Sequence, residues 1–211
     1  RNLSMHAERL LPPGLELRQV DVYDPDALRS AFTGADAVIN LVGILNEAGD
    51  NGRGFRRAHV ELVKLVIAAC ELAGVRRLLQ MSSLNAGRGD SWYLKSRGEA
   101  EAAVRASGLE WTLFEPSVVF GPGDGLFTRF GALLRLLPSP VLPLACADAK
   151  FAPVYVGDVV EAIARSLCDR AAIGETYELY GPEVVSLREV GAMSARQLGL
   201  RRWVLPLPSL L

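Results

Sequence analysis

The chain of 211 residues contains little of what disulfide and metal sites are built from. Its three cysteines, Cys70, Cys146 and Cys168, are widely spaced, odd in number and form no C-x-x-C pair. This usage is typical of buried thiols in a reducing compartment and argues against a disulfide framework. The two histidines, His6 and His59, lack the spacing of metal ligands, so we expect no metal site.

A strong excess of one charge is also absent. The formal net charge of -1 gives no general attraction to nucleic acid, and we expect no nucleic-acid partner. The most apolar stretch, residues 130–147, contains Arg135 and three prolines and is therefore a poor membrane-spanning helix. We expect no transmembrane segment. We expect a packed helix followed by a proline-rich loop there, with contact to a membrane or a partner as the alternative.

What the sequence does contain is an alternation of two patterns. Continuous apolar runs of strand type are separated by segments with apolar residues at three- and four-residue steps, which are typical of amphipathic helices. This alternation predicts an α/β fold with a mostly parallel sheet. The expected strands are residues 15–22, 35–45, 75–83, 109–121, 150–156 and 175–181, and the expected helices are residues 24–32, 55–74, 92–107, 127–137, 157–169 and 186–199.

No complete G-x-G-x-x-G occurs. The stretch "GRGF" at residues 52–55 lies between a predicted strand and a predicted helix, but Arg57 takes the place of the third glycine of that fingerprint. Direct diphosphate binding at this stretch is therefore the less favoured of two interpretations. "GPGDG" at residues 121–125 predicts a rigid turn, and a loop that borders a ligand cleft is the alternative.

The stretch "SSLNAGRGDSWYLKSRGEAE", residues 82–101, contains the candidate catalytic side chains. Ser82 and Ser83 end a predicted strand, where a hydroxyl can donate a hydrogen bond to a developing oxyanion. Tyr93 and Arg97 are four residues apart and share one helix face. Acid/base work by a tyrosine near neutral pH needs a neighbouring positive charge, which Arg97 can supply. The alternative is a surface helix on which Arg97 pairs with Glu101.

These segments, in this order, resemble the short-chain dehydrogenase/reductase superfamily in its extended and atypical branches. "YLKSRGEAE", "EPSVVFGPGD" and "FAPVYVGDVVEAI" are similar to the branch that contains the NADPH-binding accessory subunit of respiratory complex I and its bacterial relatives. The resemblance implies a Rossmann-like, doubly wound sheet. It also implies that Ser83 is the catalytic serine, that Tyr93 is the catalytic tyrosine, and that Arg97 stands where the family has its catalytic lysine.

The resemblance further implies a nicotinamide dinucleotide bound at the strand ends. Arg1 matches the basic residue that binds the adenosine 2′-phosphate, which favours NADP(H) over NAD(H). Ser82, Tyr93 and Arg97 would also contact the cofactor. The other implied contacts are Asp21 and Val22 for the adenine, Leu41, Val42 and Gly43 for the ribose and diphosphate, and Pro116, Ser117 and Val118 for the nicotinamide.

The chain departs from the family pattern in two respects. Arg97 is not equivalent to lysine, because its planar fork places donors differently from a compact ammonium group. The first strand, the glycine-rich loop and most of the second strand of the family are also absent. We therefore expect residues 1–211 to be one NAD(P)-binding domain cut from a protein of about 300 residues. Residues 170–211 would begin its smaller, substrate-side part.

Three functions remain open from the sequence. The first is a weakly catalytic or non-catalytic NADP(H)-binding protein with a structural cofactor, serving a respiratory or membrane-associated assembly. The second is an active reductase, epimerase or dehydratase that acts on a sugar nucleotide or similar carbonyl. The third is an interaction module without a cofactor. The expected location is the cytoplasm, with the inner face of a membrane as a further expectation.

Overall fold

The computed structural model describes residues 14–136 and 141–207. It consists of two compact units. The first comprises Arg1–Leu113 and Ala171–Glu175, and the second comprises Phe114–Arg170 and Thr176–Leu211.

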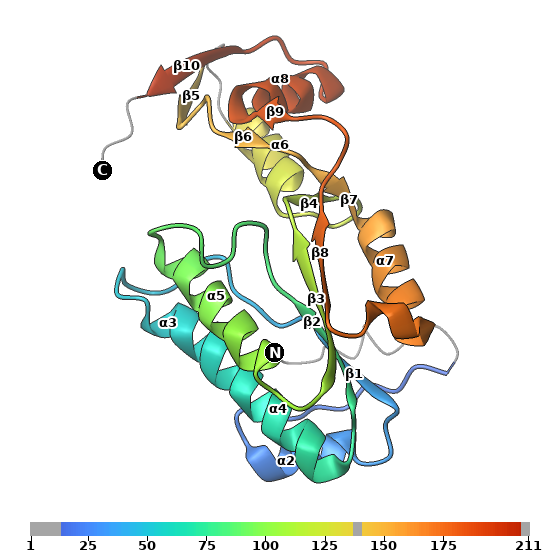
Figure 1. Cartoon of the computed structure of the whole chain (residues 1–211). Helices are drawn as coiled ribbons and strands as arrows, with labels where there is room; N and C mark the ends of the chain where they lie inside the picture. Colours follow the sequence, from blue (N-terminus) through green and yellow to red (C-terminus); the bar gives the residue numbers. More distant parts are fainter. Residues whose placement is uncertain (1–13, 137–140, 208–211) are drawn as a thin grey trace. The chain divides into compact units, whose positions relative to one another are not determined.

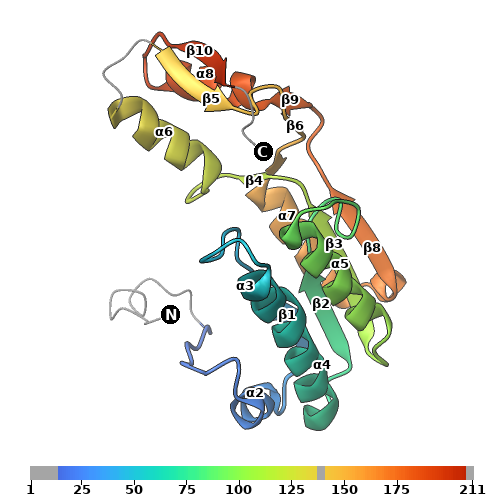
Figure 2. The same ribbon diagram turned by 90° about the vertical axis from the view of Figure 1, so that its left-hand side faces the viewer.

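The central sheet confirms the predicted α/β fold. Strand β1 (Ala37–Asn40) pairs in parallel with β2 (Arg77–Met81), in the register Ala37↔Arg77 to Asn40↔Gln80. The strand order is β1-β2-β3-β8, where β3 is Glu110–Pro116 and β8 is Glu175–Leu179 (Figures 1 and 2). Both of the latter strands begin in the first unit and end in the second.

The helices of the first unit begin and end where local sequence signals place them. Helix α2 (Pro25–Phe32) is capped by Asp24, whose carboxylate accepts two backbone N–H groups, and it has proline in its first turn. The next helical stretch runs as α3 (Arg53–Phe55), a π-helix (Arg56–Glu61) and α4 (Leu62–Ala73). It ends at Gly74, whose φ of 75° suits glycine.

Helix α5 (Trp92–Arg105) is capped by Ser91 and packs beside α4 (Figure 1). A Cβ placed on Gly98 would lie 2.5 Å from Cα of Gly87, so the loop before α5 lies directly against the helix backbone. The core of the first unit lies among α4, α5 and the sheet, and its buried members are Val38, Leu62, Val63, Val66, Cys70, Val75, Leu78, Ala100, Val104 and Leu113.

The second unit has its own core, formed by Phe130, Leu134, Leu142, Leu144, Ala147, Val190 and Ala195. Its helices are α6 (Leu126–Leu136), α7 (Val156–Cys168) and α8 (Leu187–Gln197), and a 3-10 turn follows α7 at Arg170–Ala172. Its short strands pair as β4 (Val119–Phe120) with β7 (Val154–Tyr155), and as β6 (Lys150–Phe151) with β9 (Val185–Ser186).

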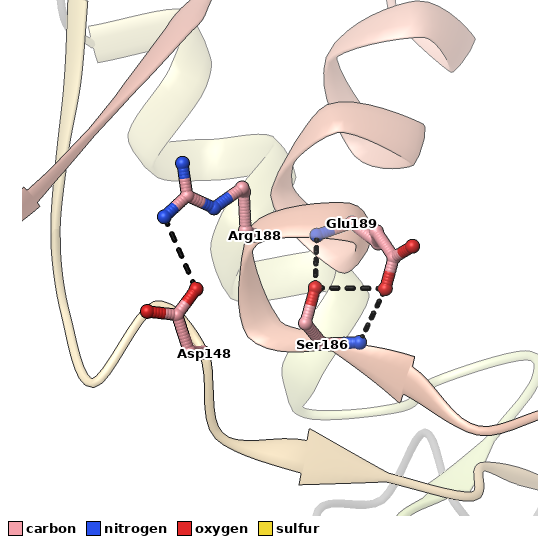
Figure 3. Close-up of polar contacts among 4 residues, drawn as sticks. All are labelled: Asp148, Ser186, Arg188 and Glu189. Carbon is pink, nitrogen blue, oxygen red and sulfur yellow. Dashed lines mark hydrogen bonds and ion pairs between the residues drawn. The ribbon is translucent and has the colours of Figure 1, made fainter.

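A capping box fixes the start of α8. The Ser186 hydroxyl accepts the N–H of Glu189, and the Glu189 carboxylate accepts the N–H of Ser186 at 2.6 Å (Figure 3). The Ser186 hydroxyl also donates to the same carboxylate oxygen at 2.7 Å, and the two hydrogen bonds that Ser186 donates to this carboxylate lower the pKa of Glu189. Arg188 pairs with Asp148 at 3.1 Å, which joins the helix start to the turn before β6.

The prediction for residues 130–147 was wrong in its second half. After α6, the proline-rich part contains strand β5 (Val141–Ala145), which pairs in parallel with β10 (Trp203–Leu207). Each strand carries one proline, and β10 lies some sixty residues further along the chain than β5. A local sequence pattern therefore cannot predict that the two strands pair. None of the helices in the described residues is long and apolar enough to cross a membrane.

Four other predicted strands need correction. Residues 15–22 form no strand, because no described strand flanks β1 on the side away from β2 and the segment has no sheet to join. The predicted strand 35–45 ends at Asn40. The predicted strands 109–121 and 150–156 are each interrupted and form β3 with β4, and β6 with β7.

Candidate functional site

Tyr93 and Arg97 share one face of α5, as predicted. The Arg97 guanidinium carbon lies 5.4 Å from the centre of the Tyr93 ring. The rings of Phe55 and His59 meet the Tyr93 ring edge to face, with ring centres 5.8 Å and 5.4 Å away. Three neighbours therefore fix the orientation of the tyrosine ring.

Arg97 is buried, with 7% of its surface exposed. Its Nη1 donates to the carbonyl oxygen of Met81, the last residue of β2, at 3.2 Å. The alternative ion pair with Glu101 does not form among the described residues, because Glu101 pairs with Arg105 at 2.9 Å. Nε of Arg97 has no hydrogen-bond partner there.

Two further unpartnered groups follow the same strand end. Ser82 and Ser83 are buried, with 5% and 8% of their surfaces exposed. Neither hydroxyl has a hydrogen-bond partner in the part of the chain that the structure describes. Buried polar groups are nearly always paired, so unpaired hydroxyls directly after Met81, whose carbonyl accepts from Arg97, indicate a place for a polar ligand.

The predicted ribose and diphosphate segment lies beside Arg97. Gly43 packs so closely against the guanidinium that a Cβ at this position would overlap it. The flanking Leu41 and Val42 are 59% and 44% exposed, although both are apolar. Asn40 fixes the segment, because its Oδ1 accepts the N–H of Val42 at 3.1 Å. Its amide also donates to Gln80 of β2.

His59 was missed as a site residue, because the sequence analysis considered it only as a metal ligand. It is fully buried in the π-helix, with Nε2 3.2 Å from the backbone N of Ile44. Its Nδ1 lies 2.8 Å from the Ser96 hydroxyl of α5. Burial and the neighbouring Arg97 charge lower the pKa of His59 to about 4. The signal available in the sequence was a histidine on the apolar face of a helix.

Glu47 was also missed, and it bears on the alternative of diphosphate binding at "GRGF". Its carboxylate accepts the N–H groups of Gly52, Gly54 and Phe55, at 2.7, 2.7 and 3.3 Å. Burial opposes ionisation, yet these hydrogen bonds lower the pKa of Glu47. A phosphate at this stretch would compete with a carboxylate of the same chain.

At "GPGDG", the backbone N–H of Asp124 donates to the Gly121 carbonyl, which closes the predicted turn.

The remaining predicted contacts are not brought to Tyr93 by any described interaction. Asp21 is exposed and accepts the N–H of Tyr23, while Val22 packs against the core of the first unit. Pro116, Ser117 and Val118 belong to the second unit. There the backbone N–H of Ser117 donates to the Leu179 carbonyl, and the Val118 carbonyl accepts the N–H of Val154. Arg1 lies outside the described residues. Within those residues, no cluster of three or more potential metal ligands occurs.

Comparison with known proteins defines the class. A protein-family model described as NAD(P)H-binding matches residues 1–124. The chain belongs to this NAD(P)H-binding family. The predicted membership in a nicotinamide-dinucleotide-binding family is thereby confirmed.

The individual relatives include a subunit of a respiratory enzyme and a reductase. The chain is 32% identical over 163 residues to the mouse mitochondrial protein "NADH dehydrogenase [ubiquinone] 1 alpha subcomplex subunit 9", covering 77% of the chain and 42% of the relative. It is 29% identical to a Streptomyces griseus "(4-alkanoyl-5-oxo-2,5-dihydrofuran-3-yl)methyl phosphate reductase", covering 94% of the chain and 65% of that reductase. It therefore spans less than half of the first relative's length.

Among solved structures, dTDP-glucose 4,6-dehydratase DesIV from Streptomyces venezuelae, with NAD and TYD bound, has a TM-score of 0.80 to this chain. The match covers 96% of this chain and 70% of the dehydratase at 21% identity. At this identity the likeness shows the fold, and it confirms the Rossmann-like architecture.

The environment of His59 predicts how stability depends on pH. A histidine with an unfolded pKa near 6.5 and a folded pKa of about 4 takes up protons more readily in the unfolded state. The stabilisation that neutral His59 contributes is therefore fully present above about pH 6.5, and it is lost as the pH falls from about 6.5 toward about 4. Between pH 7.5 and pH 5.0 we expect this residue alone to remove about 2 kcal/mol from the free energy of unfolding.

Urea unfolding at the two pH values measures this loss, and His59→Gln, which cannot titrate, should lose less than the wild type by this amount. His6→Gln removes the only other histidine and is the matched control. Equal losses in the wild type and in His59→Gln would contradict the assignment of a neutral, buried His59.

Proposed function

We propose that this chain is an NADP(H)-binding protein in which the bound cofactor is chiefly structural and in which chemistry is weak or absent. The observation that carries the proposal is the group of unpartnered polar atoms at the end of β2. Arg97 Nε and the hydroxyls of Ser82 and Ser83 are buried and lack hydrogen-bond partners among the described residues. A ligand with ribose hydroxyls and phosphates would satisfy donors of this kind.

The segment beside Arg97 also supports the proposal. Gly43 leaves its backbone accessible beside Arg97, and the exposed apolar Leu41 and Val42 offer a surface for a sugar or ring. In this proposal the segment 41–43 carries the ribose and diphosphate, and Ser83, Tyr93 and Arg97 lie at the nicotinamide side. Asp21 and Val22 at the adenine complete the proposed set within the first unit.

A bound nicotinamide supplies a hydride acceptor or donor. The chain would have to supply the proton transfer, for which Tyr93 is the candidate. Arg97 gives Tyr93 a neighbouring positive charge, but its guanidinium is already engaged with the Met81 carbonyl and packed on Gly43. A lysine ammonium would reach hydroxyls from a single point, which the planar guanidinium does not do. We therefore infer that Arg97 holds the cofactor and supports little catalysis.

The second candidate is an active reductase, epimerase or dehydratase. It is favoured by the orientation of the Tyr93 ring between Phe55, His59 and Arg97, and by the unpartnered Ser83 hydroxyl. In that case Tyr93 would be the acid/base and Ser83 would polarise a carbonyl.

Turnover distinguishes the two candidates. With NADPH bound and a panel of carbonyl and quinone substrates supplied, we expect cofactor oxidation in the wild type to be no faster than in Tyr93→Phe. The Tyr93→Phe variant keeps the ring contacts with Phe55 and His59 and removes only the phenol oxygen. A rate at least a hundredfold above that of Tyr93→Phe, at equal cofactor occupancy, would establish the active enzyme instead.

The proposed preference is for NADP(H), through Arg1 at the adenosine 2′-phosphate. A hydrogen bond to a charged group contributes roughly 1.5–3 kcal/mol, so Arg1 should favour NADPH over NADH by tenfold or more. We expect Arg1→Gln to remove this preference without weakening NADH binding. Arg18→Gln is the matched control, because Arg18 is exposed and pairs with Glu16. Equilibrium titration with both cofactors measures the effect, and an unchanged ratio in Arg1→Gln would remove Arg1 from the site.

We also propose that the protein of which residues 1–211 form a nucleotide-binding domain, with residues 170–211 beginning its substrate-side part, serves a respiratory assembly at the inner face of a membrane. The support is the similarity to a mitochondrial NADH dehydrogenase subunit. Co-migration with the intact respiratory complex tests this part, and absence from that complex under conditions that keep it intact would contradict it.

A further inference from the structure

His59 connects two segments that the cofactor would need together. Its imidazole lies between Ile44, at the end of the segment after β1, and Ser96 of α5. The Ser96 hydroxyl in turn donates to the carbonyl oxygen of Tyr93 at 2.8 Å. We call His59, Ile44, Tyr93 and Ser96 the His59 cluster.

The hydroxyl of Ser96 decides which neutral tautomer of His59 is present. The single hydroxyl proton of Ser96 is used at the Tyr93 carbonyl, so Ser96 must accept a hydrogen bond from Nδ1–H of His59. Nε2 is then free to accept the N–H of Ile44 at 3.2 Å. The opposite tautomer would donate from Nε2 to the Ile44 carbonyl and leave the Ile44 N–H without this acceptor. The geometry therefore selects neutral His59 with its proton on Nδ1.

The charged surroundings favour the same state. Arg97 of α5 is the cation that faces the imidazole, and its charge, together with burial, keeps the pKa of His59 low. Tyr93 of α5 and Phe55 at the start of the same helical stretch face it with their rings, and Ser96 with its hydroxyl. No carboxylate within the described ranges hydrogen-bonds or ion-pairs with the imidazole.

The segment that His59 holds lies outside the sheet. Residues 41–44 lie beyond the end of β1 and belong to no strand. Asn40 accepts the N–H of Val42, and His59 accepts the N–H of Ile44, so the two attachments flank Gly43. Gly43 is the residue that packs against Arg97. The position of this backbone relative to Arg97 and Tyr93 thus depends on the imidazole.

We propose that His59 is a positioning residue, which holds the segment Leu41–Ile44 against Tyr93 and Arg97 in the arrangement that receives the dinucleotide. This inference rests on the proposed cofactor function. One part of it, the attachment of the segment Leu41–Ile44 by His59, does not depend on the cofactor and can be measured without it.

The test compares His59→Phe with the wild type by two measurements. Phenylalanine keeps a ring between Phe55 and Tyr93 but accepts no hydrogen bond. Without cofactor, amide hydrogen exchange at Ile44 should accelerate about fivefold or more, as expected for one lost hydrogen bond. The NADPH dissociation constant should rise by a similar factor. His59→Gln, which retains an acceptor and a donor, should restore part of both effects.

Val66→Ala is the matched control. It removes buried volume from α4 of the same helical stretch, within a hydrophobic core that includes no member of the His59 cluster, so it should change global stability without changing Ile44 exchange relative to its neighbours. If His59→Phe does not fold, Ser96→Ala replaces it. That variant keeps His59 and removes the hydroxyl that selects the tautomer, and Ile44 exchange should again accelerate.

The outcomes are separable. Unchanged Ile44 exchange in His59→Phe, or in Ser96→Ala where that variant is used, overturns the proposal whatever the cofactor does. Faster exchange with an unchanged NADPH affinity overturns the positioning role. A wild-type chain that binds no NADPH contradicts the proposed function, while the exchange rates still decide whether His59 holds the segment.

Discussion

A buried guanidinium without a carboxylate partner determines the character of this site. Arg97 is 7% exposed, and within the described residues its contacts are the Met81 carbonyl, the Tyr93 ring and the backbone at Gly43. Removing a charge from water is costly unless it is paired, and a carbonyl with an aromatic face compensates only part of this cost. An anionic, hydroxyl-rich ligand would compensate more, so the folded chain is suited to hold one.

Several other features follow from that charge. A side chain at position 43 would displace the guanidinium, because a Cβ there would overlap Nη2 of Arg97. His59 has to stay neutral, since a second buried cation beside Arg97 would be repelled, and its neutral form is the one that can accept the Ile44 N–H. The buried charge of Arg97 also argues against efficient catalysis. A guanidinium that already donates to the Met81 carbonyl and packs on Gly43 is poorly placed to tune Tyr93 during turnover.

Local patterns predicted the features that depend on local geometry. The spacing of Tyr93 and Arg97 placed both on one helix face, and the structure has them in contact. The strand at residues 141–145 was not predictable in this way, because it depends on pairing with residues 203–207. His59 was missed for a related reason. Its role comes from contacts with two segments 15 and 37 residues away, and sequence spacing records neither of them.

The most direct test of the account is to replace Arg97 by methionine and to measure both stability and NADPH affinity. Methionine keeps much of the buried volume and removes the charge. We predict that Arg97→Met unfolds at the same or a higher urea concentration, because an uncompensated buried charge is gone, and that it binds NADPH at least tenfold more weakly. An Arg97→Met chain that binds NADPH as tightly as the wild type would contradict the central claim that this guanidinium holds the cofactor.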